Sequence, residues 1–463
     1  MPLDPVPALL ARATELLEQA FGSLPASAPE IDTLAVTKVL ATAAHRLGDN
    51  YPYFHPLYAG QMLKPPHPVA RAAYALAMTI NPNNHARDGG RASSEMEIEA
   101  VREIASMFGW TEFLGHLTTS GTIANLEALW VAGQVAPGKR GRTRILGSEQ
   151  AHYTHRRISA VLNLNYAEIP ADSHGRMSLE ALETALRKGD VGTVVVTLGT
   201  TAIGAVDPLD QILALRDRYN FRVHVDAAYG GYFRLIPESL DERARRAYSA
   251  IDQADSIVVD PHKHGLQPYG CGCILFRDPA VGRFYKHDSP YTYFTSKQLH
   301  LGEISLECSR AGASAVALWT TQQLLPLIPG GEFARGLAQG RAAALELDRR
   351  LGADSRFQPL PSHPELDIVV WKLSAETPRR ATELAQSIFA ACAARDLHLA
   401  LVELPLAWFE PASQHELAGG KLNGAKSPTV TCLRSVLMKP EHEAWLGRIW
   451  ERLAAATAEV LER

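Results

Sequence analysis

Residues 256–265 read SIVVDPHKHG, and this stretch decides the fold. A β-branched apolar run ends in an aspartate, a proline and a lysine that is flanked by two histidines. A charged lysine at the end of a buried strand costs free energy unless it is paired or reaches solvent. Lys263 therefore either extends its ammonium group to water along its apolar stem, or is held at the strand end for chemistry.

Short apolar runs of this kind alternate with helical segments in the preceding part of the chain. RILGS, TVVVTLGTTAIGA and RVHVDAAYGGYF read as strands that run into loops, with MSLEALETALRKG and LDQILALRDRYN as helices between them. This alternation predicts a parallel sheet covered by helices on both faces. Ligands bind such sheets at the carboxyl ends of the strands. The unusual residues stand there: Thr200, Thr201, Asp226, His262 and Lys263.

The pattern changes after the proline and glycine residues of LIPGGEF (327–333). A long helix is predicted over 334–351, followed by the strands DIVVWKL, LHLALVEL and TVTCLRSVLM and a last helix from about 441 to 462. Helical spacing also marks residues 6–22 and 31–47. We expect an N-terminal helical arm (1–65), a large domain (66–334) and a smaller C-terminal α+β domain (335–463).

Composition excludes several classes of function. The chain has 463 residues, of which 21% are charged, and a formal net charge of −4, which predicts no surface for nucleic acid or an anionic membrane. No segment approaches the roughly 20 apolar residues of a membrane span, and the N-terminus lacks the apolar core of a signal peptide. Five scattered cysteines are typical of a reducing compartment. We expect a cytoplasmic protein without a metal site.

Four chemically distinctive features occupy the strand ends. The small-residue turn in GHLTTSGTIAN (115–125) opens a helix, and hydroxyl and backbone N–H groups there favour a phosphate. His152 follows RILGS, Asp226 ends RVHVD and Lys263 follows SIVVD. Taken singly, each feature has an ordinary alternative: a capping turn, a surface histidine, a turn-capping aspartate and a lysine that reaches solvent.

One ligand, pyridoxal 5′-phosphate (PLP), explains all four features together. Its aldehyde needs a lysine amine, and its pyridinium nitrogen needs an acid partner. Its ring needs a flat neighbour, and its phosphate needs a helix N-terminus. The conjunction therefore predicts a PLP site.

The sequence resembles the group II PLP-dependent amino acid decarboxylases, and among these the bacterial tyrosine decarboxylase branch. GHLTTSGTIANLEALW, HVDAAYGGYF, AIDQADSIVVDPHKHG and SLECSRAGASAVALW carry the resemblance, which runs from about residue 50 to about residue 320 and more weakly beyond. It implies the aspartate-aminotransferase-like fold (fold type I): a mostly parallel seven-stranded sheet flanked by helices, with a smaller C-terminal α+β domain. It also implies a homodimer whose active sites are shared between subunits.

The resemblance assigns a role to each matching residue. Lys263 would form the Schiff base with PLP, Asp226 would pair with the pyridinium nitrogen, and His152 would stack on the ring near the scissile bond. The other implied cofactor contacts are Ser120, Gly121, Thr122 and His262 at the phosphate, Thr200 near the phenolic oxygen, and Ala228 beside the ring.

Two positions depart from the family pattern. Ser120 stands where the family usually has the first of two glycines; a serine still donates to a phosphate, but the turn then needs a compatible φ. His264 follows the lysine where methionine or tryptophan is common. These departures leave the cofactor chemistry in place and the identity of the substrate open.

The implied reaction converts an L-amino acid, tyrosine-like first, to its amine and CO₂. The segment FYKHDSPYTYFTSKQLHLGE (284–303) lies where the family has a mobile loop whose tyrosine returns a proton to the substrate. Tyr291 and Tyr293 are the candidate donors, with Tyr291 preferred; packing at a dimer interface is their alternative. In related aldehyde synthases a phenylalanine replaces this tyrosine, so the neighbouring Phe294 keeps that outcome open.

Three further residues are candidate substrate contacts. His55 and Asn84 lie in irregular stretches that border the active site in the family, with ordinary turn residues as the alternative. Arg434 stands in an otherwise apolar strand, where its guanidinium would bind a carboxylate or brace the domains. Decarboxylation of an acidic or diamino acid, a PLP-dependent aldehyde synthase or carbon–carbon lyase, and a non-catalytic cofactor-binding protein remain open as other functions.

Overall fold

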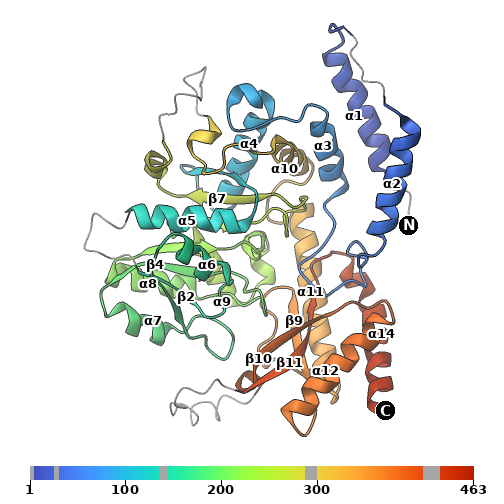
Figure 1. Cartoon of the computed structure of the whole chain (residues 1–463). Coiled ribbons are helices and arrows are strands. Elements are labelled where there is room, and N and C mark those ends of the chain that lie inside the picture. Colours follow the sequence, from blue (N-terminus) through green and yellow to red (C-terminus); the bar gives the residue numbers. More distant parts are fainter. Residues whose placement is uncertain (1–4, 26–30, 136–143, 287–299, 410–427) are drawn as a thin grey trace.

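The structure is a computed structural model that describes residues 5–25, 31–135, 144–286, 300–409 and 428–463. Figure 1 shows a larger α/β region, a smaller region below it in orange and red, and two N-terminal helices at one side. The strand ends of the larger region carry the candidate site.

The larger sheet has seven strands in the order β1-β7-β6-β5-β4-β2-β3. β7 pairs antiparallel with β1 and β6, and every pair from β6 to β3 is parallel. The predicted mostly parallel seven-stranded α/β sheet is therefore confirmed. The strands are β1 (Leu114–Thr118), β2 (Arg144–Ser148), β3 (Tyr166–Ile169), β4 (Val191–Thr197), β5 (Arg222–Asp226), β6 (Ser256–Val259) and β7 (Gly272–Phe276).

Helices cover this sheet and explain its apolar strands. β4 and β6 are buried along almost their whole length, because side chains on both faces of a parallel sheet meet helices. The register pairs Thr197 with Asp226, so β4 and β5 end together at one edge. The surrounding helices are α3 (Pro68–Met78), α4 (Arg91–Met107), α5 (Gly121–Val135), α6 (Thr154–Val161), α7 (Leu179–Leu186), α8 (Leu209–Tyr219), α9 (Glu242–Ser249) and α10 (Gly312–Leu324).

The smaller region is built on an antiparallel sheet in the order β10-β11-β9-β8. Its helices enclose a separate apolar cluster that includes Leu347, Trp371 and Leu453. The long helix predicted over 334–351 is thus present, two residues longer at its start. The elements are β8 (Phe357–Pro359), β9 (Ile368–Leu373), β10 (Ala400–Pro405), β11 (Thr429–Val436), α11 (Glu332–Gly352), α12 (Pro378–Ala393) and α14 (His442–Glu462).

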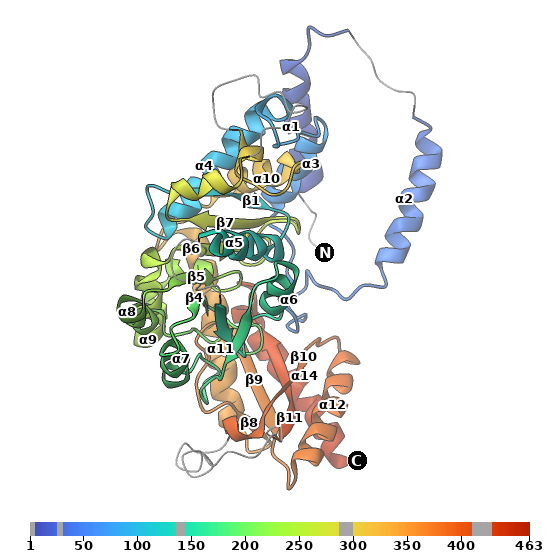
Figure 2. The same cartoon turned by 60° about the vertical axis from the view of Figure 1, so that its left-hand side comes forward.

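The N-terminal helices α1 (Val6–Ala20) and α2 (Thr33–Leu47) have no buried residue. α1 contacts α3, whereas Figure 2 shows α2 standing away from the rest of the chain. Asp32 caps α2 by accepting two backbone N–H groups. Within the described part of the chain, no helix combines the length and apolar character needed to cross a bilayer. The large apolar side chains that α2 exposes are Leu34, Val36, Val39, Leu40 and Leu47.

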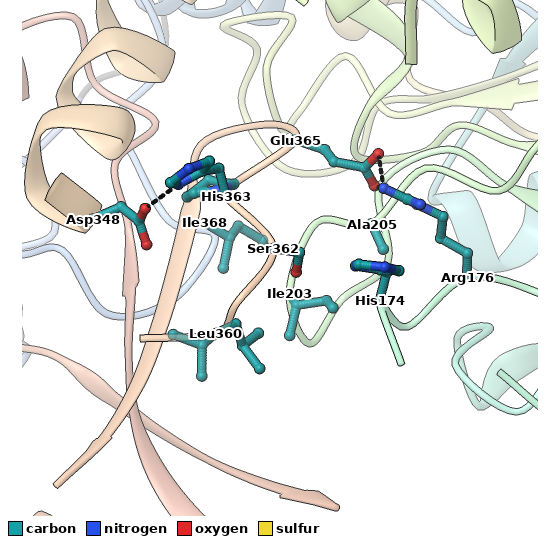
Figure 3. A pocket seen from close by; sticks show the side chains of 12 residues that line it. His174, Arg176, Ile203, Ala205, Asp348, Leu360, Ser362, His363, Glu365 and Ile368 are labelled. Carbon is teal, nitrogen blue, oxygen red and sulfur yellow. Dashed lines mark hydrogen bonds and ion pairs between the residues drawn. The ribbon is translucent and has the colours of Figure 1, made fainter. Parts of the chain in front are cut away.

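A buried ion pair joins the two regions. Arg176 reaches Glu365 through two hydrogen bonds, from Nε to Oε2 at 3.2 Å and from Nη2 to Oε1 at 2.7 Å (Figure 3). The backbone N–H of Val206 also donates to Glu365 Oε2 at 2.8 Å. The adjoining cavity in Figure 3 has a volume of about 20 Å³, which fits a water molecule and no amino acid. We therefore interpret this cluster as a structural brace.

Replacing Glu365 with leucine is expected to lower the free energy of unfolding by about 3–5 kcal/mol, because it leaves the buried guanidinium of Arg176 unpaired. Urea unfolding followed by circular dichroism measures this change. The control is Arg379→Ala, which breaks an exposed pair with Glu383 and should cost about 0–1 kcal/mol. Equal effects of the two variants would contradict the brace.

Candidate active site

The loop after β6 brings Lys263 to the N-terminus of α5. Lys263 Nζ lies 3.1 Å from Asp260 Oδ2, and Asp260 in turn lies against the first residue of α5, Gly121. A Cβ at Gly121 would stand 2.6 Å from both carboxylate oxygens of Asp260, so only glycine fits there. The lysine and the predicted phosphate turn are therefore neighbours.

Asp226, the last residue of β5, is buried and held by two donors. His155 Nε2 lies 2.7 Å from Oδ2, and the backbone N–H of Ala228 donates to Oδ1 at 3.1 Å. Burial alone would raise the pKa of Asp226, but the hydrogen bond from His155 and the charge of Lys263 hold it below its usual range. Asp226 is thus an anion that keeps free lone pairs for a cationic N–H.

His152 lies within electrostatic reach of Asp226 and Lys263. Burial lowers its pKa, while the charge of Asp226 raises it and that of Lys263 lowers it, so both groups act on the imidazole. Its Nδ1 is 2.8 Å from Thr154 Oγ1, and the half-buried imidazole lies against the ring of Tyr153, with ring centroids 4.4 Å apart. A flat neutral ring beside a lysine and a carboxylate suits stacking on an aromatic cofactor.

The predicted phosphate turn forms the start of α5. Ser120 Oγ accepts the N–H of Ile123 at 3.3 Å, and Thr122 is exposed. His262 stands close by, with Nδ1 2.7 Å from the carbonyl oxygen of Cys271 and Nε2 3.5 Å from Asp260 Oδ2. The free N–H groups of a helix start provide an anion site here.

These residues fit PLP in chemistry and in order. An anion site, an amine, a flat ring and a buried carboxylate with spare lone pairs are brought together at one sheet edge. Asp260 Oδ1 is buried and has no hydrogen-bond partner among the described residues, which marks an incomplete polar network beside Lys263. Ser120, Gly121, Thr122, His152, Asp226, Ala228, His262 and Lys263 all belong to this neighbourhood.

The side chain of Thr200 lies in the turn after β4. It is fully buried, and its hydroxyl accepts the N–H of Ala205 at 3.0 Å, which closes the turn after β4. Its hydroxyl therefore faces the turn, and Thr201 is the exposed residue of the pair. Its hydroxyl thus has a structural role in the turn, and the contact of Thr200 with the phenolic oxygen stays a prediction.

The side chain of Asn84 lies in a buried hydrogen-bond network. Its Nδ2 donates to Glu97 Oε2 at 2.7 Å and to the carbonyl of Ser93 at 3.2 Å, and its Oδ1 accepts from Ser93 Oγ at 2.5 Å. The side chain is fully buried in this network, which also takes in Arg310. The amide thus stabilises the fold, and its contact with a substrate stays a prediction.

The guanidinium group of Arg434 donates hydrogen bonds to three backbone carbonyl groups. Its Nε donates to the carbonyl of Ala202 at 2.9 Å, Nη2 to that of Thr201 at 2.7 Å, and Nη1 to that of Gly60 at 3.2 Å. Every guanidinium nitrogen is therefore engaged by the protein. Arg434 of β11 ties the loop after β4 to the segment around Gly60, which favours the bracing role, and its binding of a substrate carboxylate stays a prediction.

His55 packs edge-to-face on Trp445 of α14, with ring centroids 4.8 Å apart, and its Nδ1 accepts the N–H of Leu57. This places it against the smaller region and not beside Lys263, so its role at a shared site stays a prediction. Tyr291, Tyr293 and Phe294 lie outside the described residues.

Two residues of the site escaped the sequence reasoning. Asp260 stands inside the DPHKHG motif, three residues before Lys263, a spacing that brings both side chains to one side of a turn. His155 follows His152 by three residues at the start of α6, and its pairing with Asp226 depends on how α6 packs on β5. Only the structure reveals that second contact.

Comparison with known proteins agrees with this site. Residues 50–373 match the family model described as the pyridoxal-dependent decarboxylase conserved domain. An L-tyrosine decarboxylase of Enterococcus faecium is 28% identical, with 68% of each chain covered. A probable L-tyrosine/L-aspartate decarboxylase of Methanothermobacter thermautotrophicus is 28% identical, with 71% of this chain and 86% of the relative covered.

A solved structure supports the fold independently. The crystal structure of mouse CSAD in apo form superposes with a TM-score of 0.77 at 21% identity, and covers 96% of this chain and 92% of that one. At this identity the likeness shows the fold alone, which agrees with fold type I. From the family match and the geometry of Lys263, Asp226 and His152, the chain belongs to the pyridoxal-dependent decarboxylase family and is a PLP-dependent amino acid decarboxylase.

Proposed function

We propose that this enzyme decarboxylates an aromatic L-amino acid, with L-tyrosine as the preferred substrate, to the amine and CO₂. The observation that carries the proposal is the cluster at one sheet edge, where Lys263 lies beside the start of α5 and its charge reaches Asp226. The names of the bacterial and archaeal relatives support tyrosine first and aspartate second.

Each residue of the site has a separate role in the proposed reaction. When bound, PLP supplies an electron sink for the electron pair released as the substrate's Cα–carboxylate bond breaks. Lys263 would hold the cofactor through its ε-amine. Asp226 keeps a proton on the ring nitrogen, which stabilises the charge that develops in the reaction. His152 would cover the ring face, and the phosphate would be held by Ser120, Gly121, Thr122 and His262.

The proton that replaces the carboxylate is assigned, by resemblance, to Tyr291 or Tyr293, with Tyr291 preferred. Phenylalanine variants of each, tested for amine, aldehyde and peroxide, separate the two. Because the proton donor completes the amine after CO₂ has left, the donor's variant should form less amine. With dissolved O₂ as the oxidant, it should form more aldehyde, together with ammonia and hydrogen peroxide.

The experiment that tests the proposed function is incubation of the purified, PLP-reconstituted enzyme with each of the twenty amino acids. Release of CO₂ and formation of the amine are measured together. Tyramine from L-tyrosine at the highest kcat/KM is the expected result. A higher kcat/KM for aspartate or for a diamino acid would show that L-tyrosine is not the preferred substrate. Formation of aldehyde, ammonia and peroxide would identify the enzyme as an aldehyde synthase. Absence of CO₂ release from every amino acid would refute the proposal.

Gly121→Ala is expected to weaken PLP binding about tenfold or more, because the new methyl group would stand 2.6 Å from the Asp260 carboxylate and displace the phosphate turn. Titration of the apoenzyme with PLP, followed by fluorescence, measures the dissociation constant. The control is Gly447→Ala in α14, where no atom lies within 4 Å of the added Cβ. Unchanged affinity in Gly121→Ala would place the phosphate elsewhere.

We further propose a homodimer in which α2 packs on a second copy of the chain. An isolated helix of 15 residues is marginal in water, and α2 exposes five large apolar side chains without a partner in the described part of its own chain. Analytical ultracentrifugation should give twice the mass of the chain. A monomer at micromolar concentration would contradict this.

Location and domain division complete the proposal. All five cysteines are free, four of them buried, which supports a location in the reducing environment of the cytoplasm.

The two separate sheets support a large domain over 66–334 and a small domain over 335–463, with 1–65 as an arm.

A further inference from the structure

His155 carries a role that the proposed reaction does not include. It lies in the first turn of α6, its side chain is fully buried, and its Nε2 is 2.7 Å from Asp226 Oδ2. This is a short hydrogen bond to a carboxylate, the stronger kind that involves an ionised acceptor.

The two ring nitrogens of His155 differ in their hydrogen bonds within the described residues. His155 Nδ1 has no hydrogen-bond partner among the described residues. The neighbouring ring of His224, 6.3 Å away, uses both its nitrogens on Ser256 Oγ and Asn125 Oδ1, each at 2.8 Å. The tautomer that fits has its proton on Nε2, because a proton on Nδ1 would be buried without an acceptor. His155 is therefore a donor dedicated to Asp226.

The hydrogen bond decides both the charge and the direction of the Asp226 carboxylate. Desolvation opposes ionisation at this buried position, and the bond from His155 is the largest of the interactions that overcome it. His155 fixes Oδ2 and the N–H of Ala228 fixes Oδ1, so the carboxylate cannot rotate freely. Its remaining lone pairs keep one orientation.

We propose that His155 is a positioning residue that keeps Asp226 ionised and aimed at the pyridine nitrogen of PLP. This inference rests on the proposed role of Asp226. The carboxylate and the ring nitrogen share one proton, and a donor on Oδ2 lowers the basicity of the carboxylate. The proton therefore stays on the nitrogen. Without His155 the carboxylate gains basicity and draws the proton toward oxygen, and the ring loses its positive charge.

The test compares two substitutions at position 155. His155→Leu keeps the volume and removes the donor, whereas His155→Gln places an amide N–H near the position of Nε2. We expect the leucine variant to bind PLP about 10- to 100-fold more weakly, as expected for the loss of a hydrogen bond to a charged group. The pH midpoint of the visible absorption of the bound cofactor should shift, and kcat should fall with KM nearly unchanged. The glutamine variant should recover most of each loss.

The matched control is Ile158→Ala, which removes a buried apolar side chain of the same helix without touching Asp226. It should lower the melting temperature but leave the spectrum and its pH midpoint as in the wild type. If His155→Leu does not fold, His155→Asn serves instead, because its shorter amide cannot reach Oδ2.

Two outcomes would overturn the inference alone: wild-type PLP affinity and spectrum in the leucine or asparagine variant, or equal changes in the Ile158→Ala control with no rescue by glutamine. A wild-type enzyme that binds PLP at a lysine other than Lys263 would overturn the site itself, and this inference with it. Peptide mapping after borohydride reduction identifies that lysine, so the two failures are distinguishable.

Discussion

Replacing Lys263 with alanine is expected to abolish the visible absorption of covalently bound PLP and to reduce decarboxylation by at least about 10⁴-fold. One positioned proton-transfer group contributes up to about this factor, and Lys263 also forms the covalent link to the cofactor. The amine stands beside the α5 N-terminus, 3.1 Å from Asp260, and the DPHKHG motif contains no second lysine. Absorption spectra and CO₂ release measure the two losses.

The control for this variant is Lys188→Ala, which removes an exposed lysine after α7. It should leave spectrum and rate at the wild-type level. Retention of covalent cofactor in Lys263→Ala, detected by borohydride reduction and mass spectrometry, would end the assignment of the site.

Asp226→Asn is expected to lower kcat by about 10²- to 10³-fold, the scale of one lost electrostatic contact to charge that develops in a reaction. The amide has nearly the same shape but no charge, so it cannot hold a proton on the ring nitrogen. Covalent PLP should remain, because Lys263 is intact. Stopped-assay kinetics give the rate, and absorption confirms that the cofactor is bound.

A second buried carboxylate provides the comparison. Asp207 accepts the N–H groups of Met177 and Thr197, and burial raises its pKa to about 7. Asp207→Asn should therefore affect stability and leave kcat almost unchanged. Wild-type kcat in Asp226→Asn would show that the ring nitrogen has another partner.

The central strands are readily predicted from the sequence, and the edge strands are not. β4, β5 and β6 are buried on both faces, so their valine-rich runs are unmistakable. The sequence of β1, LGHLT, favours a turn, because it is short and leads directly into the glycine of α5. β3 is a half-exposed edge strand of four residues with no apolar run. Such strands depend on pairing with neighbours, which composition does not reveal.

The same distinction holds for the site. The sequence predicts Lys263, Asp226 and His152 for one site because the chemistry of one ligand requires them at successive strand ends. The buried contacts of Asn84 and Arg434 are not predictable, because a polar residue in a buried hydrogen-bond network and one that binds a ligand have the same appearance in a sequence. The contact between His155 of α6 and Asp226 of β5 joins residues far apart in the chain, and no local sequence pattern predicts it.

The bracing by Arg434 has a consequence for biosynthesis. Gly60, Thr201 and Arg434 leave the ribosome at widely separated times, yet the guanidinium ties all three segments together. A nascent chain contains the reactive lysine long before it contains β11. The three segments are therefore joined by Arg434 only after β11 has been synthesised.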